Sequence, residues 1–502
     1  MKLKLGCALV LSAMAYGQFG RGNGDWSTSG GDAHRSSWVP GDPKISRDGM
    51  LKPGFQFLWK LKMDNAKALT TPVLLSGYIG YRGFRTLGYV GGSSDSVYAM
   101  DTDLARMEWQ KHFAVAEPAA CSGMTANVAR ATGTAFPTPP DPSGSGRSRA
   151  ARSAVGEPDQ GAAILTTMQE QARRAALAAL APPAGSASGS ASGSAGTGPT
   201  PPRPAPPPAP RLPNVVYALS SDGKLHGMLV SNGDEPDPPM QFLPPNAHAV
   251  GLTVVGAMAY AVTTGNCGGV PNEVWGLDLV AKNKVVAWTL EGDAAGWEGP
   301  AFGGDGTVYV ATTTGSVLAL DPQTLTPKDA YTARGQSFTS SPVVFQYKEK
   351  TLIAAASKDG HIHLLDSANL KKPLAIAVAE SNSGALTTWS QIDGTRWLLS
   401  AGSKAIQAWK VVEQNGAISL QPGWVSHDIA SPATPMVING VVFAASPTVL
   451  YALDGVNGKE LWNSGATIAS PIRGGTLAGG DSQIYLATAD GTLYAFGYPL
   501  EH

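Results

Sequence analysis

Few side chains in this 502-residue sequence have the types and spacing that catalysis or metal binding requires. His361 and His363 alternate along one apolar run, so they would share one face of a strand, where two imidazoles can bind a metal ion. His363 nevertheless stands where other parts of the chain carry tyrosine, which favours a packed ring over a ligand. The sequence contains no glycine-rich phosphate loop, no serine nucleophile elbow and no cysteine–histidine cluster. It therefore indicates an architecture more clearly than a reaction.

The N-terminus has the features of an export signal. Lys2 and Lys4 precede an apolar stretch at residues 5–13, which is too short to span a bilayer. A small-x-small cleavage site follows at residues 13–15. We therefore expect residues 1–15 to be a signal peptide and the protein to be exported, either to a periplasm or to the outside of the cell.

Removal of this signal, which contains Cys7, leaves two cysteines, Cys121 and Cys267. Export permits a disulfide between them. The sequence does not show that the two side chains meet, so two free thiols stay open as the alternative.

The composition excludes several classes of function. The formal net charge is −1, so the protein has no basic field that would attract nucleic acid. With 60 glycines, 38 prolines and only 15% charged residues, the chain is typical of a turn-rich β protein. No segment beyond the signal has the length and apolarity of a transmembrane helix. We expect a monomer without nucleic-acid partners.

A five-residue pattern recurs eight times: an aliphatic residue, a variable one, a small one, a large apolar one and usually Asp. Successive copies are 43 to 49 residues apart, except for one spacing of 128 that contains an insertion. A period near 45 with several short strands per copy is typical of propeller blades. The copies begin at Val97, Leu225, Val274, Val317, Ile362, Ile406, Leu450 and Leu493.

Two positions of the repeat have expected structural roles. The Asp carboxylate can accept hydrogen bonds from the backbone N–H groups of the turn that follows it. Trp109 and Trp462 each stand eight residues after their Asp. We expect these indoles to cover the gap between neighbouring blades.

The last copy ends at Gly497, which leaves no room for the outer strand of its blade before residue 502. Residues 55–60 precede the first copy and have the pattern of an outer strand without a blade. We therefore predict an all-β, eight-bladed β-propeller of four-stranded antiparallel blades, closed by this N-terminal strand. The propeller would take residues 55–130 and 214–502, after a lead-in segment at residues 16–54.

Residues 131–213 interrupt the second copy of the repeat. They contain 16 of the 38 prolines and one aromatic residue, Phe136. Such a segment has too little apolar area to order itself. We predict a low-complexity, largely disordered insertion, with a helix at residues 161–180 as the exception.

The unit from Tyr451 to Trp462 resembles the repeat of pyrroloquinoline-quinone-type (PQQ-like) propellers. The opening segment, with Asp25, Trp26 and residues 35–37, looks like the lead-in of the same superfamily. The resemblance covers nearly all of residues 25–498 except the insertion. It implies the fold but not the activity, because the superfamily includes quinoprotein alcohol dehydrogenases and also non-enzymatic members similar to the scaffold lipoprotein of the outer-membrane barrel-assembly machine.

The resemblance implies what a dehydrogenase would need. Those enzymes stack PQQ on a disulfide between adjacent cysteines and bind Ca²⁺ through Glu and Asn oxygens. This chain has no adjacent cysteines. Asn266, after Gly265, is the one weak calcium candidate, although such a pair between strands is usually a turn. Trp297 or Trp389 would have to face the channel to replace the missing cofactor wall.

We therefore expect a binding or scaffold module for protein or peptide partners, with no catalytic residues and no cofactor. The alternative is a PQQ- and calcium-dependent alcohol or sugar dehydrogenase.

Thiol counting under denaturing, non-reducing conditions tests the predicted bridge between Cys121 and Cys267. If the two are paired, the exported protein has no reactive thiol until it is reduced. The bridge would close a loop of roughly 147 residues and stabilise the fold by about 4–5 kcal/mol on loop entropy alone. Two reactive thiols before reduction would contradict it.

Overall fold

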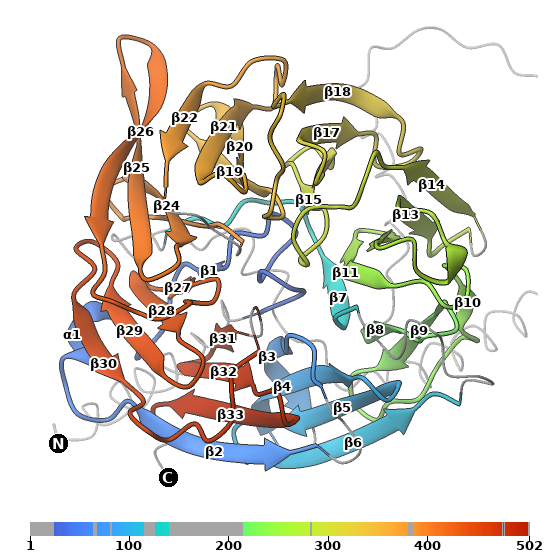
Figure 1. Cartoon of the computed structure of the whole chain (residues 1–502). Coiled ribbons are helices and arrows are strands. Elements are labelled where there is room, and N and C mark those ends of the chain that lie inside the picture. Colours follow the sequence, from blue (N-terminus) through green and yellow to red (C-terminus); the bar gives the residue numbers. More distant parts are fainter. Residues whose placement is uncertain are drawn as a thin grey trace, which may run out of the picture.

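The computed structural model describes residues 25–63, 68–80, 83–114, 126–139, 214–281, 284–379, 385–473, 475 and 477–499. The predicted signal peptide, Cys121 and the predicted helix at 161–180 lie outside these residues. The described chain is almost entirely β-structure and forms a ring of sheets (Figure 1). This confirms the all-β propeller prediction.

Seven sheets are described: five with four strands, one with five and one with eight. In the largest, two four-stranded halves are joined where β7 (Ala129–Thr132) runs parallel to β11 (Ala249–Val255). In the five-stranded sheet, the short β1 (Trp38–Val39) is added to four strands. The described strands therefore divide into eight four-stranded antiparallel units, which we number as blades 1 to 8 in chain order.

In each of blades 1 to 4, the strands follow one another along the chain from the axis to the rim. Blade 1 contains β3 (Val73–Gly80), β4 (Gly83–Gly92), β5 (Ser96–Asp101) and β6 (Arg106–His112). Blade 2 contains β7, β8 (Val215–Leu219), β9 (Lys224–Leu229) and β10 (Met240–Gln241). Blade 3 contains β11, β12 (Met258–Thr263), β13 (Glu273–Asp278) and β14 (Val285–Thr289). Blade 4 contains β15 (Ala301–Phe302), β16 (Val308–Ala311), β17 (Ser316–Leu320) and β18 (Pro327–Thr332).

Blades 5 to 7 repeat this order, and blade 8 takes its outer strand from the N-terminal part of the chain. Blade 5 contains β19 (Val343–Tyr347), β20 (Lys350–Ala356), β21 (His361–Asp366) and β22 (Ala375–Val378). Blade 6 contains β23 (Thr387–Ser390), β24 (Arg396–Ala401), β25 (Ile406–Gln414) and β26 (Ala417–Val425). Blade 7 contains β27 (Met436–Ile438), β28 (Val441–Ala445), β29 (Leu450–Asp454) and β30 (Glu460–Asn463). Blade 8 contains β31 (Ala478–Gly480), β32 (Gln483–Ala487), β33 (Thr492–Gly497) and β2 (Gln56–Lys62).

The strand expected at residues 55–60 pairs with the last repeat. β2 runs antiparallel to β33, from Gln56 opposite Gly497 to Lys62 opposite Thr492. Trp59 then joins blade 8 to blade 1, because its Nε1 donates to the Thr102 carbonyl at 2.9 Å. Strands from the two ends of the described chain therefore share one sheet (Figure 1).

The small third position of the repeat makes room for the outer strand. Trp109 lies opposite Ala99, and Trp462 lies opposite Ala452. Trp59 and Trp424 likewise face alanines in blades 8 and 6. In blade 5 the large and small residues are exchanged. Leu364 replaces the small residue of the repeat, and the small Ala375 lies opposite it.

The indoles cover the gaps between blades, as expected. Trp109 Nε1 donates to the Val230 carbonyl of blade 2 at 3.1 Å. Its ring lies against Gly233, where a Cβ would come within 2.7 Å of the indole and where φ is +75°. Only glycine combines that backbone conformation with so close an approach. The repeat Asp also acts as predicted, since Asp101 Oδ1 accepts from the backbone N–H groups of residues 103 and 104.

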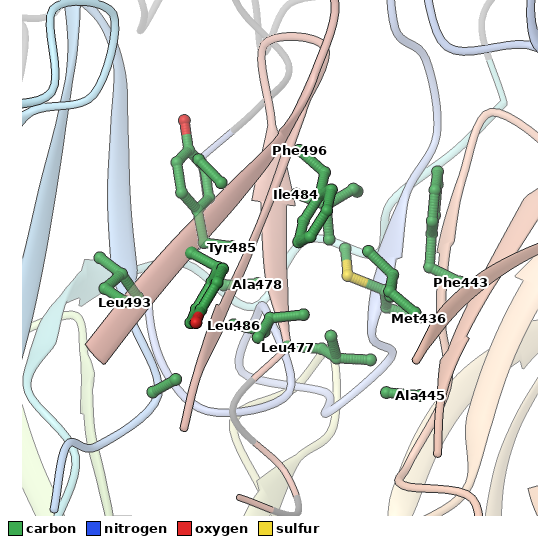
Figure 2. Packing of buried hydrophobic residues seen from close by; sticks show 14 of the residues in the cluster. Met436, Phe443, Ala445, Leu477, Ala478, Ile484, Tyr485, Leu486, Leu493 and Phe496 are labelled. Carbon is green, nitrogen blue, oxygen red and sulfur yellow. The ribbon is translucent and has the colours of Figure 1, made fainter. Parts of the chain in front are cut away.

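Apolar side chains pack between adjacent blades as well as within them. One cluster joins blades 7, 8 and 1 to the lead-in, and its members are almost fully buried. Met436 of blade 7 reaches toward Ile484 and Phe496 of blade 8 (Figure 2). Each such side chain contributes about 1.5–3 kcal/mol through burial, so the ring depends on contacts between blades.

The start of the predicted insertion is part of the propeller. β7 extends to Thr132, and residues up to 139 are described. Phe136 stacks on His34 with ring centroids 4.1 Å apart, and Thr134 Oγ1 donates to the Gly304 carbonyl of blade 4. The remainder of the insertion lies outside the described residues. Of the helices in the described chain, α1 (Arg47–Met50) and the 3₁₀ turn η2 (Cys267–Gly269), neither has the length or apolarity to cross a membrane.

Replacing β2 tests how much the ring depends on closure. A Gly/Ser substitution of residues 56–62 that keeps the lead-in removes the packing of Leu58, Trp59 and Leu61 and exposes the edge of β33. We expect a loss of about 5 kcal/mol or more and aggregation, measured by denaturant unfolding and size-exclusion chromatography. The matched control replaces residues 285–289 in β14, an outer strand that does not link the chain ends. Equal losses in both variants would contradict a special role for closure.

Candidate functional site at the propeller axis

The lead-in segment runs through the centre of the ring and meets the blades in chain order. Along residues 26–39, backbone carbonyls accept hydrogen bonds of 2.8–3.1 Å from inner-strand N–H groups. The donors are Leu74 (blade 1), Arg130 (blade 2), Phe302 (blade 4), Val344 (blade 5), Thr388 (blade 6), and Val437 and Asn439 (blade 7). Thr28 Oγ1 reaches the Leu252 carbonyl of blade 3, and Asp42 accepts from Ser482 of blade 8. The segment thus satisfies backbone groups that inner strands would otherwise leave unpaired.

Arg35 is the charged centre of this arrangement and is fully buried. Its guanidinium donates five hydrogen bonds, all to carbonyl or hydroxyl oxygens. The acceptors are the Pro300 carbonyl at 2.9 Å, Thr28 Oγ1 at 3.1 Å, the Ser29 carbonyl, the Gly251 carbonyl at 3.3 Å and Thr253 Oγ1 at 2.5 Å. Burial lowers the pKa of Arg35 to about 10, against the opposing effect of Glu298 and Asp32. Arg35 therefore stays charged at neutral pH and ties the lead-in to blades 3 and 4.

Glu298 lies close to Arg35 and is 1% exposed. Its Oε2 is enclosed and has no hydrogen-bond partner among the described residues. Burial raises the pKa of the Glu298 carboxyl to about 7, with Arg35 opposing the rise and Asp32 adding to it. Glu298 is therefore a carboxyl group that can hold or release a proton near neutral pH. Sequence reasoning missed it, because its burial depends on contacts distant in sequence.

Glu298 borders a small cavity at the axis. The cavity measures about 10 Å³, which is room for one water molecule. Its lining residues are Gly30, Ser37, Glu298, Thr434, Pro435, Met436, Gly475 and Leu477.

Side chains also pack where the lead-in faces blade 4. Asp32 accepts hydrogen bonds from the backbone of His34 and from both the backbone and the hydroxyl of Ser36. His34 Nδ1 donates to the Phe302 carbonyl at 2.6 Å, and Phe136 covers the ring. His34 Nε2 is enclosed without a partner in the described part of the chain.

Of the two tryptophans considered for the channel, one adjoins the axis. A Cβ on Gly475, where φ is +75°, would come within 1.6 Å of Trp297, so this indole lies directly against the Gly475 backbone beside the cavity. Trp389 is instead buried within the blade packing, stacked on Trp397 with centroids 6.2 Å apart.

The predicted calcium candidate lies in an exposed turn. Asn266 has a left-handed conformation, with φ of 45°, and its backbone N–H donates to Asn272 Oδ1 at 3.0 Å. The neighbouring Gly265 N–H donates to Asp293 Oδ1 at 2.6 Å. These contacts explain Asn266 as a turn residue, and its role as a calcium ligand stays a prediction.

The other residues considered from sequence have local explanations. Cys267 is disulfide-bonded. Its partner lies outside the described residues, so pairing with Cys121 stays a prediction. His363 is a packed ring, 2% exposed, with Nδ1 at 3.0 Å from the Tyr331 hydroxyl and Nε2 at 3.3 Å from Ser357 Oγ. His361 instead contacts Asp359 at 2.8 Å.

No protein-family model matches the chain, and no curated protein matches its sequence. Solved structures do match it. BamB from Moraxella catarrhalis is 14% identical with a TM-score of 0.50, over 89% of this chain and 99% of that one. A quinohemoprotein alcohol dehydrogenase from Comamonas testosteroni is 13% identical with a TM-score of 0.57, over 95% and 81%. A europium-containing methanol dehydrogenase is 11% identical with a TM-score of 0.58, over 95% and 98%.

At these identities the likeness shows the fold alone. Topology and the filled axis define a β-propeller. The chain has the fold of the PQQ-like β-propellers, which its solved neighbours share.

The carboxyl at the axis predicts a pH-dependent stability. Because the folded pKa of Glu298 lies above its ordinary value of 4.5, the stabilisation is complete below that value and is lost as pH rises through about 7. The free energy of unfolding should fall by up to about 3 kcal/mol between pH 5 and pH 8, measured by denaturant titration. Glu298→Gln should flatten this slope, and Glu349→Gln, at an exposed position, should keep it. A Glu298→Gln variant with the slope of the parent would contradict the assignment.

Proposed function

We propose that this chain is an exported PQQ-like propeller that acts as a binding or scaffold module for protein or peptide partners. The observation that carries the proposal is the filled axis. The lead-in occupies it with its own backbone and Arg35, and the cavity beside Glu298 has a volume of about 10 Å³. Small-molecule sites usually need a concave space of about 300–1,000 Å³. The open surfaces of the ring are better suited to a macromolecule.

The rim of the ring offers apolar side chains to such a partner. Val378 is 77% exposed and Val425 is 60% exposed. The two valines end the outer strands of neighbouring blades, opposite His361 and Gln407 respectively. Exposed aliphatic side chains that gather on adjacent blades are a feature of protein contact surfaces. Export of the module rests on the predicted signal peptide at residues 1–15.

A PQQ- and calcium-dependent dehydrogenase is the alternative, favoured by the similarity of the fold to two solved alcohol dehydrogenases. Titration with PQQ and excess Ca²⁺ separates the two functions. We expect no saturable binding, no shift of the melting temperature and no dye-linked oxidation of alcohols or sugars.

Two asparagine variants sharpen this experiment. Asn266 and Asn415 both stand in left-handed turns, with φ of 45° and 51°. One-to-one binding that Asn266→Ala abolishes and Asn415→Ala preserves, together with substrate-dependent dye reduction, would overturn the scaffold function.

A further inference from the structure

Arg396 is another of the buried arginines, and its surroundings differ from those of Arg35. It is the first residue of β24 and is 8% exposed. Its guanidinium lies over the Trp38 ring at 5.4 Å and over the Phe345 ring at 5.7 Å. These aromatic rings come from the lead-in and from blade 5, so Arg396 fills a gap between three segments. Burial lowers its pKa to about 10, which leaves it charged at neutral pH.

Within the described chain, the Arg396 guanidinium makes no hydrogen bond and no ion pair. Its nitrogens are also not among the enclosed polar atoms that lack a partner. The unpaired side of the guanidinium therefore faces solvent, between two apolar walls. A charge that is mostly removed from water and has no counter-ion is costly, so an incoming anion would relieve that cost.

The carboxylates near this position are already bound. Val411 lies opposite Arg396, so Glu413, two residues further along β25, points to the same face. Glu413 contacts Lys348 Nζ at 2.5 Å. Asp393, in the turn before β24, accepts a hydrogen bond from the Thr395 N–H at 2.8 Å. With Asp393 counted, these four groups carry no net charge. Burial is the one cause that shifts the pKa of Arg396, however, so neither carboxylate lies close enough to offset its charge.

The same turn also presents an apolar side chain. Ile392 is 63% exposed and stands four residues before Arg396 in the hairpin that joins β23 to β24. The hairpin that carries Arg396 therefore also presents an aliphatic side chain to solvent. This combination favours an acidic residue with apolar neighbours over a small inorganic anion.

We propose that the Arg396 guanidinium binds a carboxylate side chain from an acidic, apolar-flanked peptide segment of a protein partner. The planar guanidinium presents a fork of donors that matches a carboxylate. This inference rests on the proposed function as a module for protein or peptide partners. It identifies the chemistry of one contact within that function.

Two synthetic peptides test the proposal on the full-length protein. The probe is acetyl-Gly-Val-Glu-Val-Gly-amide, and its uncharged match carries Gln in place of Glu. We expect the Glu peptide to bind about tenfold more tightly, because a hydrogen bond between two charged groups is stronger than one from a charged group to a neutral amide. Arg396→Gln should abolish this difference and Arg396→Lys should retain part of it. Arg334→Gln, at an exposed position, should leave it unchanged.

Three results would overturn the proposal. One is equal binding of the two peptides by the parent protein. Another is discrimination that survives in Arg396→Gln. The third is displacement of the Glu peptide by inorganic phosphate at equal or lower concentration, because that would assign the site to phosphorylated ligands.

A stability measurement checks the unpaired charge without any ligand. Arg396→Met keeps the length and apolar contacts of the side chain and removes the charge, so the melting temperature should rise. A fall relative to Arg334→Met would show that the folded chain already compensates Arg396. The PQQ titration tests the proposed function, and the two peptides test the role of Arg396. Either proposal can therefore fail while the other holds.

Discussion

The structure depends on how the inner strands of the ring complete their hydrogen bonds. Eight strands converge on one axis, and each has an edge there that no neighbouring strand of its own blade can pair. The lead-in supplies the missing acceptors to one blade after another. Arg35 supplies the opposite kind of group, donating to the Pro300 and Gly251 carbonyls that face the same space. Once the axis is filled in this way, the described cavity beside Glu298 has room for about a single water molecule.

Arg35 and Arg396, two of the buried arginines, illustrate how partners decide the role of a charged side chain. Burial lowers the pKa of both to about 10. Arg35 has five oxygen acceptors, so its charge is accommodated within the fold and serves to fix the lead-in. Arg396 has two aromatic faces and no acceptor among the described residues. The first arrangement satisfies the guanidinium and the second leaves its donors available, and that contrast separates a structural arginine from one suited to recognition.

The sequence predicted those features that repeat at short range. The third and fifth positions of the repeat anticipated the alanines opposite Trp109 and Trp462 and the turn held by Asp101, because both depend on neighbours within one blade. The path of the lead-in had no such signature. Arg35 and Pro300 are 265 positions apart, and nothing local pairs them. Glu298 was missed for the same reason. The only hint of Arg396 was a cation at the head of an otherwise apolar strand, followed by Trp397 and leucines. The contact of Phe136 with the His34 ring likewise had no signature in the sequence.

The position of β2 has a consequence for how the chain acquires its shape. Synthesis proceeds from the N-terminus, so residues 26–62 emerge before any of the inner strands that they will contact. Their last partner, β33, ends at Gly497, and β2 cannot pair until that strand exists. Contacts of such separation are slow to form, and strands waiting for them stay exposed to self-association. An early strand of the propeller thus reaches its native place only after the last described strand has been made.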